Sequence, residues 1–184
     1  AANIDIQMIC PLHGYVWRKD LDKFIDKYVK WSTYTPEINS VMIAYASVYG
    51  GTQNAAEILA GKLAQNGVKD IKMYDVSVTH PSYILSDAFK YSHIVFASTT
   101  YNNGIFVNME NLLHDIVAHN LQNRKIAILE NGSWAPVSGK LMTEVLSGLK
   151  NTEIIKAGVS LKSAVKTDKY EELENLAKTI TESM

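Results

Sequence analysis

From residue 41 onward, apolar runs of strand length alternate with stretches in which apolar residues recur at helical spacing. The apolar runs predict five strands, at residues 41–47, 70–76, 92–98, 124–130 and 153–160. Each predicted strand is followed by enough chain for a helix. Five strand-then-helix units of this size predict an α/β fold with a doubly wound, five-stranded parallel sheet and helices on both faces.

The helices between these strands are predicted from the spacing of their apolar residues. The first carries apolar residues at every fourth position, at Ala55, Leu59 and Leu63. Gly67 is placed to end this helix. Two more helices are predicted at residues 105–119 and 136–149, and the last is predicted to begin at a capping box, Asp168-x-x-Glu171.

The first 38 residues follow a different pattern. Residues 20–31 carry apolar side chains on one face of a predicted helix, at Leu21, Phe24, Ile25, Tyr28 and Trp31. The turn-rich segment 32–36 follows this helix. We therefore expect a boundary near residues 36–40, with residues 1–38 forming an inter-domain linker that contains one helix and residues 39–184 forming the folded domain.

The composition is that of a domain with its own core. The chain has 184 residues, 47% of them hydrophobic, a formal charge of -1 and a pI near 6.6. Because the basic residues are scattered, we expect no nucleic-acid partner, and because no apolar run approaches ~18 residues we expect no membrane partner. Cys10 is the single cysteine, which excludes an internal disulfide and fits a cytoplasmic location. The chain begins Ala-Ala rather than Met, so we expect it to be a piece of a longer protein.

The loop Ser47-Val-Tyr-Gly-Gly-Thr52 joins the first predicted strand to the first predicted helix. Its two glycines allow a tight turn with inward-pointing N–H groups, and the helix N-terminus adds a favourable field for an anion. The loop contains no Lys or Arg. It therefore suits a single phosphate monoester, bound by amides and by the hydroxyls of Ser47 and Thr52. The alternative is an ordinary strand-to-helix turn capped by Thr52.

Two further loops are expected at the same edge of the sheet, because the carboxyl ends of parallel strands lie together. One is Ser98-Thr-Thr-Tyr-Asn-Asn-Gly104, and the other is Asn131-Gly-Ser-Trp-Ala-Pro136. They supply side-chain amides, hydroxyls and two large aromatic residues, Tyr101 and Trp134. A planar heteroaromatic ring with a phosphorylated tail would use all three loops, and FMN has this structure. The asparagines and Gly104 could also simply make a turn.

Other nucleotide-binding motifs are absent from the sequence. No G-x-G-x-x-G opens the first predicted helix, and no G-x-x-x-x-G-K-[ST] occurs anywhere. Both absences argue against a dinucleotide site of the Rossmann type and against ATP hydrolysis.

In combination, these three loops and the leading segment from Ile9 to Arg18 resemble the C-terminal, flavodoxin-like part of the flavodiiron proteins. This family, also called the A-type flavoproteins, includes rubredoxin:oxygen oxidoreductase. The matching motifs are Ser-x-x-Gly-x-Thr, Ser-Thr-Thr-Tyr-Asn-x-Gly and Asn-Gly-Ser-Trp-Ala-Pro. The resemblance covers nearly the whole chain and implies a flavodoxin-like fold with strand order 2-1-3-4-5.

The resemblance also implies which residues bind the FMN. They are the residues of the three loops: Ser47, Val48, Tyr49, Gly50, Gly51, Thr52, Thr99, Thr100, Tyr101, Asn102, Asn103, Gly104, Asn131, Gly132, Ser133 and Trp134. Gly51 stands where the family often has a bulkier polar residue, which predicts a freer loop. His13 matches the last iron-ligating histidine of the family, a role that requires the di-iron domain missing from this chain.

By this resemblance the chain is the electron-transfer domain of a flavodiiron oxidoreductase. It relays electrons from a small redox protein such as rubredoxin to a di-iron centre that reduces O2 or NO in the full-length parent, which forms a head-to-tail homodimer. Without that centre, the chain is not expected to complete O2 or NO reduction. Two alternatives stay open: a free-standing, flavodoxin-like NAD(P)H:quinone reductase, and an interaction domain without flavin on the same scaffold.

Overall fold

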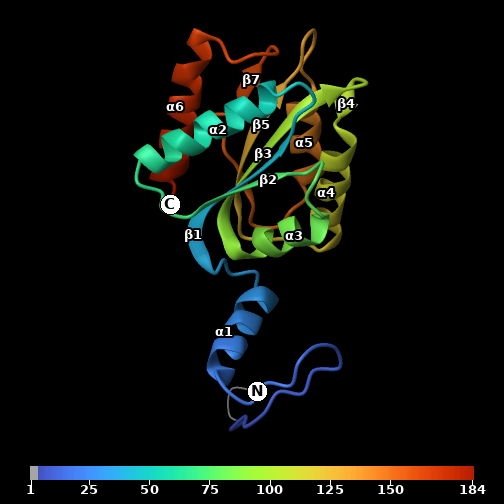
Figure 1. Cartoon of the computed structure of the whole chain (residues 1–184), viewed down its shortest axis with the longest axis vertical. Coiled ribbons are helices and arrows are strands. Elements are labelled where there is room, and N and C mark those ends of the chain that lie inside the picture. Colours follow the sequence, from blue (N-terminus) through green and yellow to red (C-terminus); the bar gives the residue numbers. More distant parts are fainter. Residues whose placement is uncertain (1–3) are drawn as a thin grey trace.

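The structure is a computed structural model that describes residues 4–184, and its main body is a parallel sheet between two helical layers (Figure 1). Its elements, in chain order, are α1 (Leu21–Ser32), β1 (Ile38–Ala46), α2 (Gly51–Gln65), β2 (Ile71–Asp75), α3 (Pro81–Lys90), β3 (Tyr91–Tyr101), β4 (Gly104–Ile105), α4 (Val107–Ala118), β5 (Lys125–Asn131), α5 (Ser138–Leu146), β6 (Glu153–Ile154), β7 (Val159–Leu161) and α6 (Thr167–Glu182).

The sheet has the order β2-β1-β3-β5-β6, and all these neighbours are parallel. This confirms the flavodoxin-like order 2-1-3-4-5, but the sheet has seven strands rather than five, because β7 pairs with β5 and the short β4 pairs antiparallel with β3. The predicted fifth strand is divided in two, because Ile154 pairs with Ile126 while Val159 pairs with Leu129. Four residues of the edge strand therefore lie opposite two residues of β5, and the extra residues separate β6 from β7.

Two hydrophobic clusters fill the space between the sheet and its helices. α3, α4 and α5 cover one face, and α2 and α6 cover the other. In β1 the side chains of Met42 and Ala44 enter the first cluster, while Val41 and Ile43 enter the second. Because both faces of the central strand are buried, it is apolar at consecutive positions rather than at alternate ones.

The C-terminus of α2 and the N-terminus of α6 test two predictions that were made from local sequence signals. After α2, Gly67 has a φ of 94° and its N–H donates to Ala64, while Val68 donates to Leu63. This is a Schellman motif, so the predicted stop at Gly67 is confirmed. The predicted capping box is wrong: α6 begins at Thr167 with Lys166 as its N-cap, and no side chain caps it.

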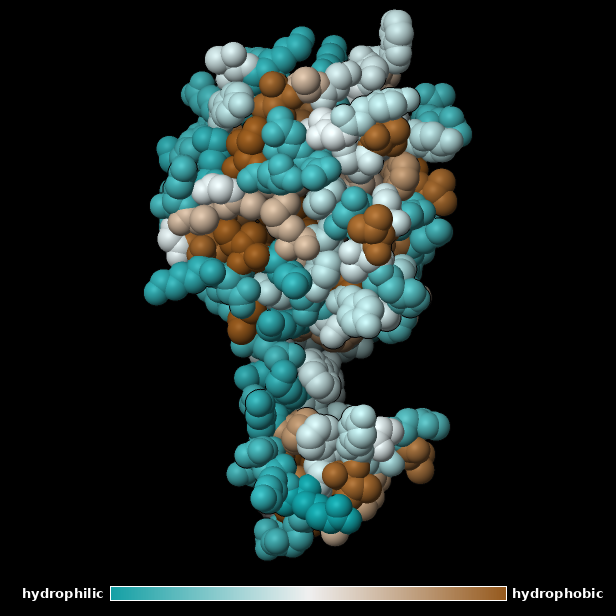
Figure 2. All heavy atoms as spheres, viewed as in Figure 1, coloured by the Kyte–Doolittle hydropathy of each residue, from teal (hydrophilic) through white to brown (hydrophobic). Residues whose placement is uncertain are grey.

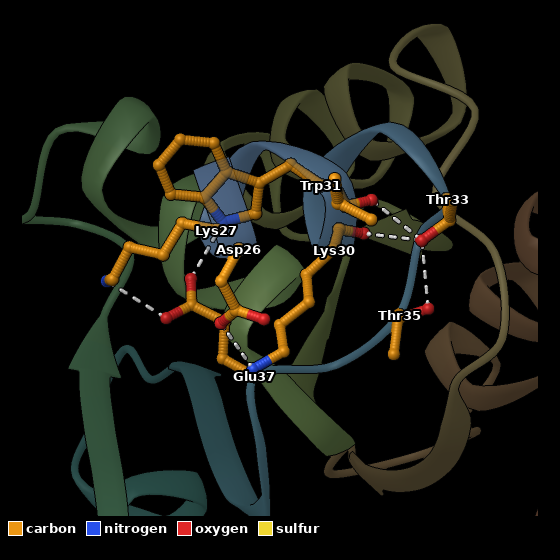
Figure 3. Close-up of polar contacts among 8 residues, drawn as sticks. Asp26, Lys27, Lys30, Trp31, Thr33, Thr35 and Glu37 are labelled. Atoms are coloured by element: carbon orange, nitrogen blue, oxygen red, sulfur yellow. Dashed lines mark hydrogen bonds and ion pairs between the residues drawn. The ribbon is translucent and has the colours of Figure 1, made fainter. Parts of the chain in front are cut away.

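The linker between α1 and the sheet is held by polar contacts at both of its ends. At the end next to β1, the Glu37 carboxylate accepts a hydrogen bond of 2.7 Å from Trp31 Nε1 of α1 and pairs with Lys27 Nζ at 3.0 Å (Figure 3). These hydrogen bonds and the charge of Lys27 lower the pKa of Glu37, against the opposing effect of its partial burial. No α1 residue is buried, and apolar side chains lie exposed in the small N-terminal part of the molecule (Figure 2).

At the end next to α1, the linker is bound by Arg124, a residue that is only 2% exposed. Its guanidinium donates hydrogen bonds to five backbone carbonyls, those of Tyr34, Ala88, Phe89, Gln122 and Asn123. Burial lowers the pKa of this guanidinium to about 10. Arg124 therefore joins the linker, the end of α3 and the start of β5 through a single charged group.

Replacing Arg124 is expected to destabilise the domain. Arg124→Met fills similar space but leaves buried carbonyls without donors, so the free energy of unfolding in urea should fall by about 3 kcal/mol or more. Arg18→Met changes the same residue type at an exposed position and should shift that free energy by less than about 0.5 kcal/mol. Equal effects of the two substitutions would contradict this account of Arg124.

Candidate functional site

A cavity of about 230 Å³ lies at the carboxyl edge of the sheet, at the end of the molecule opposite α1 (Figure 1). The loops after β1, β5 and β7 surround it, together with Thr99 of β3. None of its lining residues is charged, and most carry a hydroxyl or an amide: Ser47, Val48, Tyr49, Gly51, Thr52, Thr99, Asn131, Gly132, Ser133, Ser163 and Ala164. The cavity therefore offers hydrogen bonds rather than ion pairs.

The first loop brings an unpartnered hydroxyl to the N-terminus of α2. Ser47 Oγ is buried and has no hydrogen-bond partner among the described residues. Gly50, the N-cap of α2, has a φ of 83°, a conformation that glycine adopts without steric cost. Since a glycine has no side chain to cap the helix, the first N–H groups of α2 keep their hydrogen-bonding capacity for a ligand.

The N-terminus of α5 lies at the same edge but is closed by side chains. Thr100 Oγ1 accepts hydrogen bonds from the N–H groups of Val137 and Ser138 at 3.0 and 3.2 Å. The carboxylate of Glu130 accepts one from Gly139 at 2.8 Å. Of these two helix N-termini, only that of α2 is left open to an anion.

The second loop is a hairpin. Tyr101 pairs with Gly104 in the antiparallel ladder of β3 and β4, and Asn102 and Asn103 form its two-residue turn with φ values of 49° and 57°. Left-handed conformations at both positions are typical of a type I′ turn, and asparagine tolerates them. The Tyr101 ring packs edge-on against Phe106, with centroids 6.1 Å apart, and stays 47% exposed.

Large aromatic side chains stand at the surface of the first and third loops. Trp134 is 94% exposed and Tyr49 is 99% exposed. Neither ring is covered by the described part of the chain. Exposed aromatics next to a polar cavity are suited to contact a ligand ring or a partner protein.

The structure brings nine of the predicted cofactor-binding residues together around the cavity: Ser47, Val48, Tyr49, Gly51, Thr52, Thr99, Asn131, Gly132 and Ser133. The other seven lie outside its lining: Gly50, Thr100, Tyr101, Asn102, Asn103, Gly104 and Trp134. The sequence reasoning missed Ser163 and Ala164, which follow β7. The sequence signal that could have found them is a hydroxyl residue shortly after a strand. That strand, β7, has only three residues, of which the first and last are buried.

His13 lies in the N-terminal segment, at the other end of the molecule from the cavity, and it is exposed. Within residues 4–184, no group of three or more His, Cys, Asp or Glu side chains is placed to hold a metal. The same range contains no helix with both the length and the hydropathy needed to cross a bilayer.

Comparisons with known proteins identify the class of this domain. Residues 43–177 match the flavodoxin family, so the chain belongs to that family. The fold of this family implies a flavin, FMN, and the open N-terminus of α2, the free hydroxyl of Ser47 and the uncharged lining fit its phosphate.

The chain is also similar to proteins of the flavodiiron group. It is 28% identical to rubredoxin-oxygen oxidoreductase of Megalodesulfovibrio gigas over 185 residues, which cover 100% of this chain and 45% of that protein. The solved structure of rubredoxin oxygen:oxidoreductase from Desulfovibrio gigas superposes with a TM-score of 0.87 over 96% of this chain and 44% of that one. The flavodiiron protein of Giardia intestinalis, 19% identical, has the same fold, with a TM-score of 0.84 over 99% of this chain and 47% of that one. The chain spans less than half the length of these relatives.

The unpartnered hydroxyl of Ser47 gives a prediction for the protein without ligand. Ser47→Ala removes a buried group that forms no bond, so the ligand-free domain should be equally stable or up to about 1 kcal/mol more stable. Ser138→Ala is the matched control, because Ser138 Oγ is buried and donates to the Ser98 carbonyl at 3.0 Å. It should lose about 1 kcal/mol. Urea unfolding measures both; a clear loss in Ser47→Ala would mean that its hydroxyl is bonded.

Proposed function

We propose that this chain is the FMN-binding electron-transfer domain of a flavodiiron oxidoreductase. The observation that carries the proposal is the buried, unpartnered Ser47 hydroxyl beside the open N-terminus of α2, within a cavity that has no charged lining. A phosphate monoester would satisfy the hydroxyl and the helix N–H groups together. The similarity of the whole chain to rubredoxin-oxygen oxidoreductase supports the flavodiiron assignment.

In this proposal each loop has a separate part in holding the cofactor. Residues 47–52 bind the phosphate, and the hydroxyls and backbone of Thr99 and of residues 131–133 contact the tail. The flavin ring would contact the exposed aromatic side chains near the cavity, which are Tyr49, Tyr101 and Trp134. When bound, FMN supplies an acceptor and donor for one or two electrons, and the protein determines its orientation and its exposure.

The proposed electron donor is a small redox protein such as rubredoxin, and the proposed acceptor is a di-iron centre in a domain outside this chain. The exposed rings of Tyr49 and Trp134 offer a contact surface at the rim of the cavity. The N-terminal segment, which contains the proposed iron ligand His13, lies at the opposite end of the molecule (Figure 1). This separation supports transfer between two copies, and hence a head-to-tail homodimer of the full-length parent.

The flavin assignment is tested by adding FMN to the purified chain. We expect one FMN per chain, with flavin absorption and no iron bands, and at least tenfold weaker binding of riboflavin, because riboflavin lacks the phosphate. Equal affinities would contradict the phosphate cradle. A colourless protein that cannot be reconstituted would favour the interaction domain instead.

The electron donor is tested with the same FMN-loaded chain under anaerobic conditions. Reduced rubredoxin should bleach the flavin absorption within seconds, whereas NADH alone should leave it unchanged over minutes, because the sequence has no dinucleotide-binding motif. Dithionite serves as the positive control for a reducible flavin. Direct bleaching by NADH would favour the quinone reductase.

A further inference from the structure

The segment after β7 closes one side of the cavity, although it belongs to none of the three loops discussed above. Ser163 and Ala164 line the cavity, and Ser163 Oγ donates to Ser133 Oγ at 3.2 Å. Ser163 has a φ of 67°, in the left-handed region that few serines occupy. Such a conformation persists only where surrounding contacts impose it.

The contacts that impose it come from a single side chain. The Asn131 amide donates to the Ser163 carbonyl at 2.8 Å and accepts from the Ser163 N–H at 2.8 Å. Asn131 is only 4% exposed, whereas Ser163 lies at the surface, so both bonds are partly buried. Its side-chain donor and acceptor are both used by the backbone of residue 163.

The same segment also lies against the phosphate cradle. A Cβ built at Gly51, the first residue of α2, would overlap the Ser163 carbonyl oxygen and lie 3.1 Å from Asn131 Nδ2. The sequence analysis predicted that the lack of a side chain at Gly51 would make this loop freer. The structure does not bear this out. The space is occupied by the Ser163 backbone, which rests on the N-terminus of α2.

We infer that Ser163 and Ala164 form a fourth wall of the cofactor cavity. Asn131 holds this wall in position, the lack of a side chain at Gly51 leaves room for it, and the wall determines selectivity for a phosphorylated tail. The inference rests on the proposed function, since it concerns the same cavity. Asn131 is a positioning residue here, because it acts on the ligand through Ser163. The Ser163 hydroxyl, brought beside Ser133 near the start of α2, contacts the phosphate-bearing end of the ligand.

The position of the wall can be tested without any flavin. In the ligand-free protein, the Ser163 amide should exchange with solvent at least tenfold more slowly than an unprotected amide, because it donates to a buried acceptor. Asn131→Ala should abolish this protection while the amides of β5 stay protected. Rapid exchange of the Ser163 amide in the unmodified protein would overturn the inference, whether or not the chain binds FMN.

Two glycine substitutions in the same helix test the effect on ligand binding. Gly51→Ala should displace the wall and weaken FMN binding at least tenfold, with a smaller effect on riboflavin, which lacks the phosphate. Gly61→Ala is the matched control, since a Cβ there meets nothing within 4 Å, and it should leave both affinities unchanged. An equal loss for FMN and riboflavin, or no loss, would overturn the inference while leaving FMN binding itself established.

A double-mutant cycle tests whether Asn131 acts through Ser163. Ser163→Ala should weaken FMN binding about threefold to tenfold, the effect of one hydrogen bond. Asn131→Ala should weaken it at least as much, and the double variant should lose no more than Asn131→Ala alone, because the displaced hydroxyl is already lost. Additive losses would show that Asn131 contacts the ligand independently and would overturn its role as a positioning residue.

Discussion

The N–H groups that begin α2 are the constraint around which the carboxyl edge of the sheet is organised. A helix N-terminus needs acceptors for its first N–H groups, and here the N-cap is Gly50, which has no side chain. Helix α5, on the opposite face of the sheet, meets the same need internally, through Thr100 and Glu130. The N-terminal N–H groups of α5 thus have acceptors within the protein, whereas no side chain caps those of α2, which can bind an external acceptor.

The uncharged lining of the cavity follows from this division. A helix N-terminus and the hydroxyls of Ser47 and Thr52 can bind a dianion without an ammonium or guanidinium group. Without such cations, recognition depends on how closely neutral donors surround the ligand, so small shifts of backbone matter. The close packing of residues 51, 131 and 163 shows that the backbone is held closely there by two hydrogen bonds from the buried side chain of Asn131.

The apolar runs predicted the strands well, because burial on both faces makes strands such as β1 continuously apolar. Their order was predicted from the family resemblance. The sequence predicted the site less completely. Thr100 carries a hydroxyl that could bind a ligand, but this hydroxyl accepts hydrogen bonds from the N-terminus of α5. No local sequence pattern distinguishes a ligand-binding threonine from one that caps a helix. Ser163 was missed because its position depends on hydrogen bonds to Asn131, which lies 32 residues earlier. It also follows β7, a short strand that is separated from β6 at the edge of the sheet. Contacts of this kind are set by tertiary packing and leave no periodicity in the sequence.

The two ends of β1 have separate roles, and the strand fixes the distance between them. Its first residue follows Glu37, which is bound to α1, and its last residue precedes Ser47. Nine residues of strand span about 30 Å at roughly 3.3 Å per residue. Arg124 binds the carbonyl of Tyr34, and Glu37 pairs with Lys27 of α1, so the N-terminal segment that contains His13 is attached at the end of β1 far from the cavity.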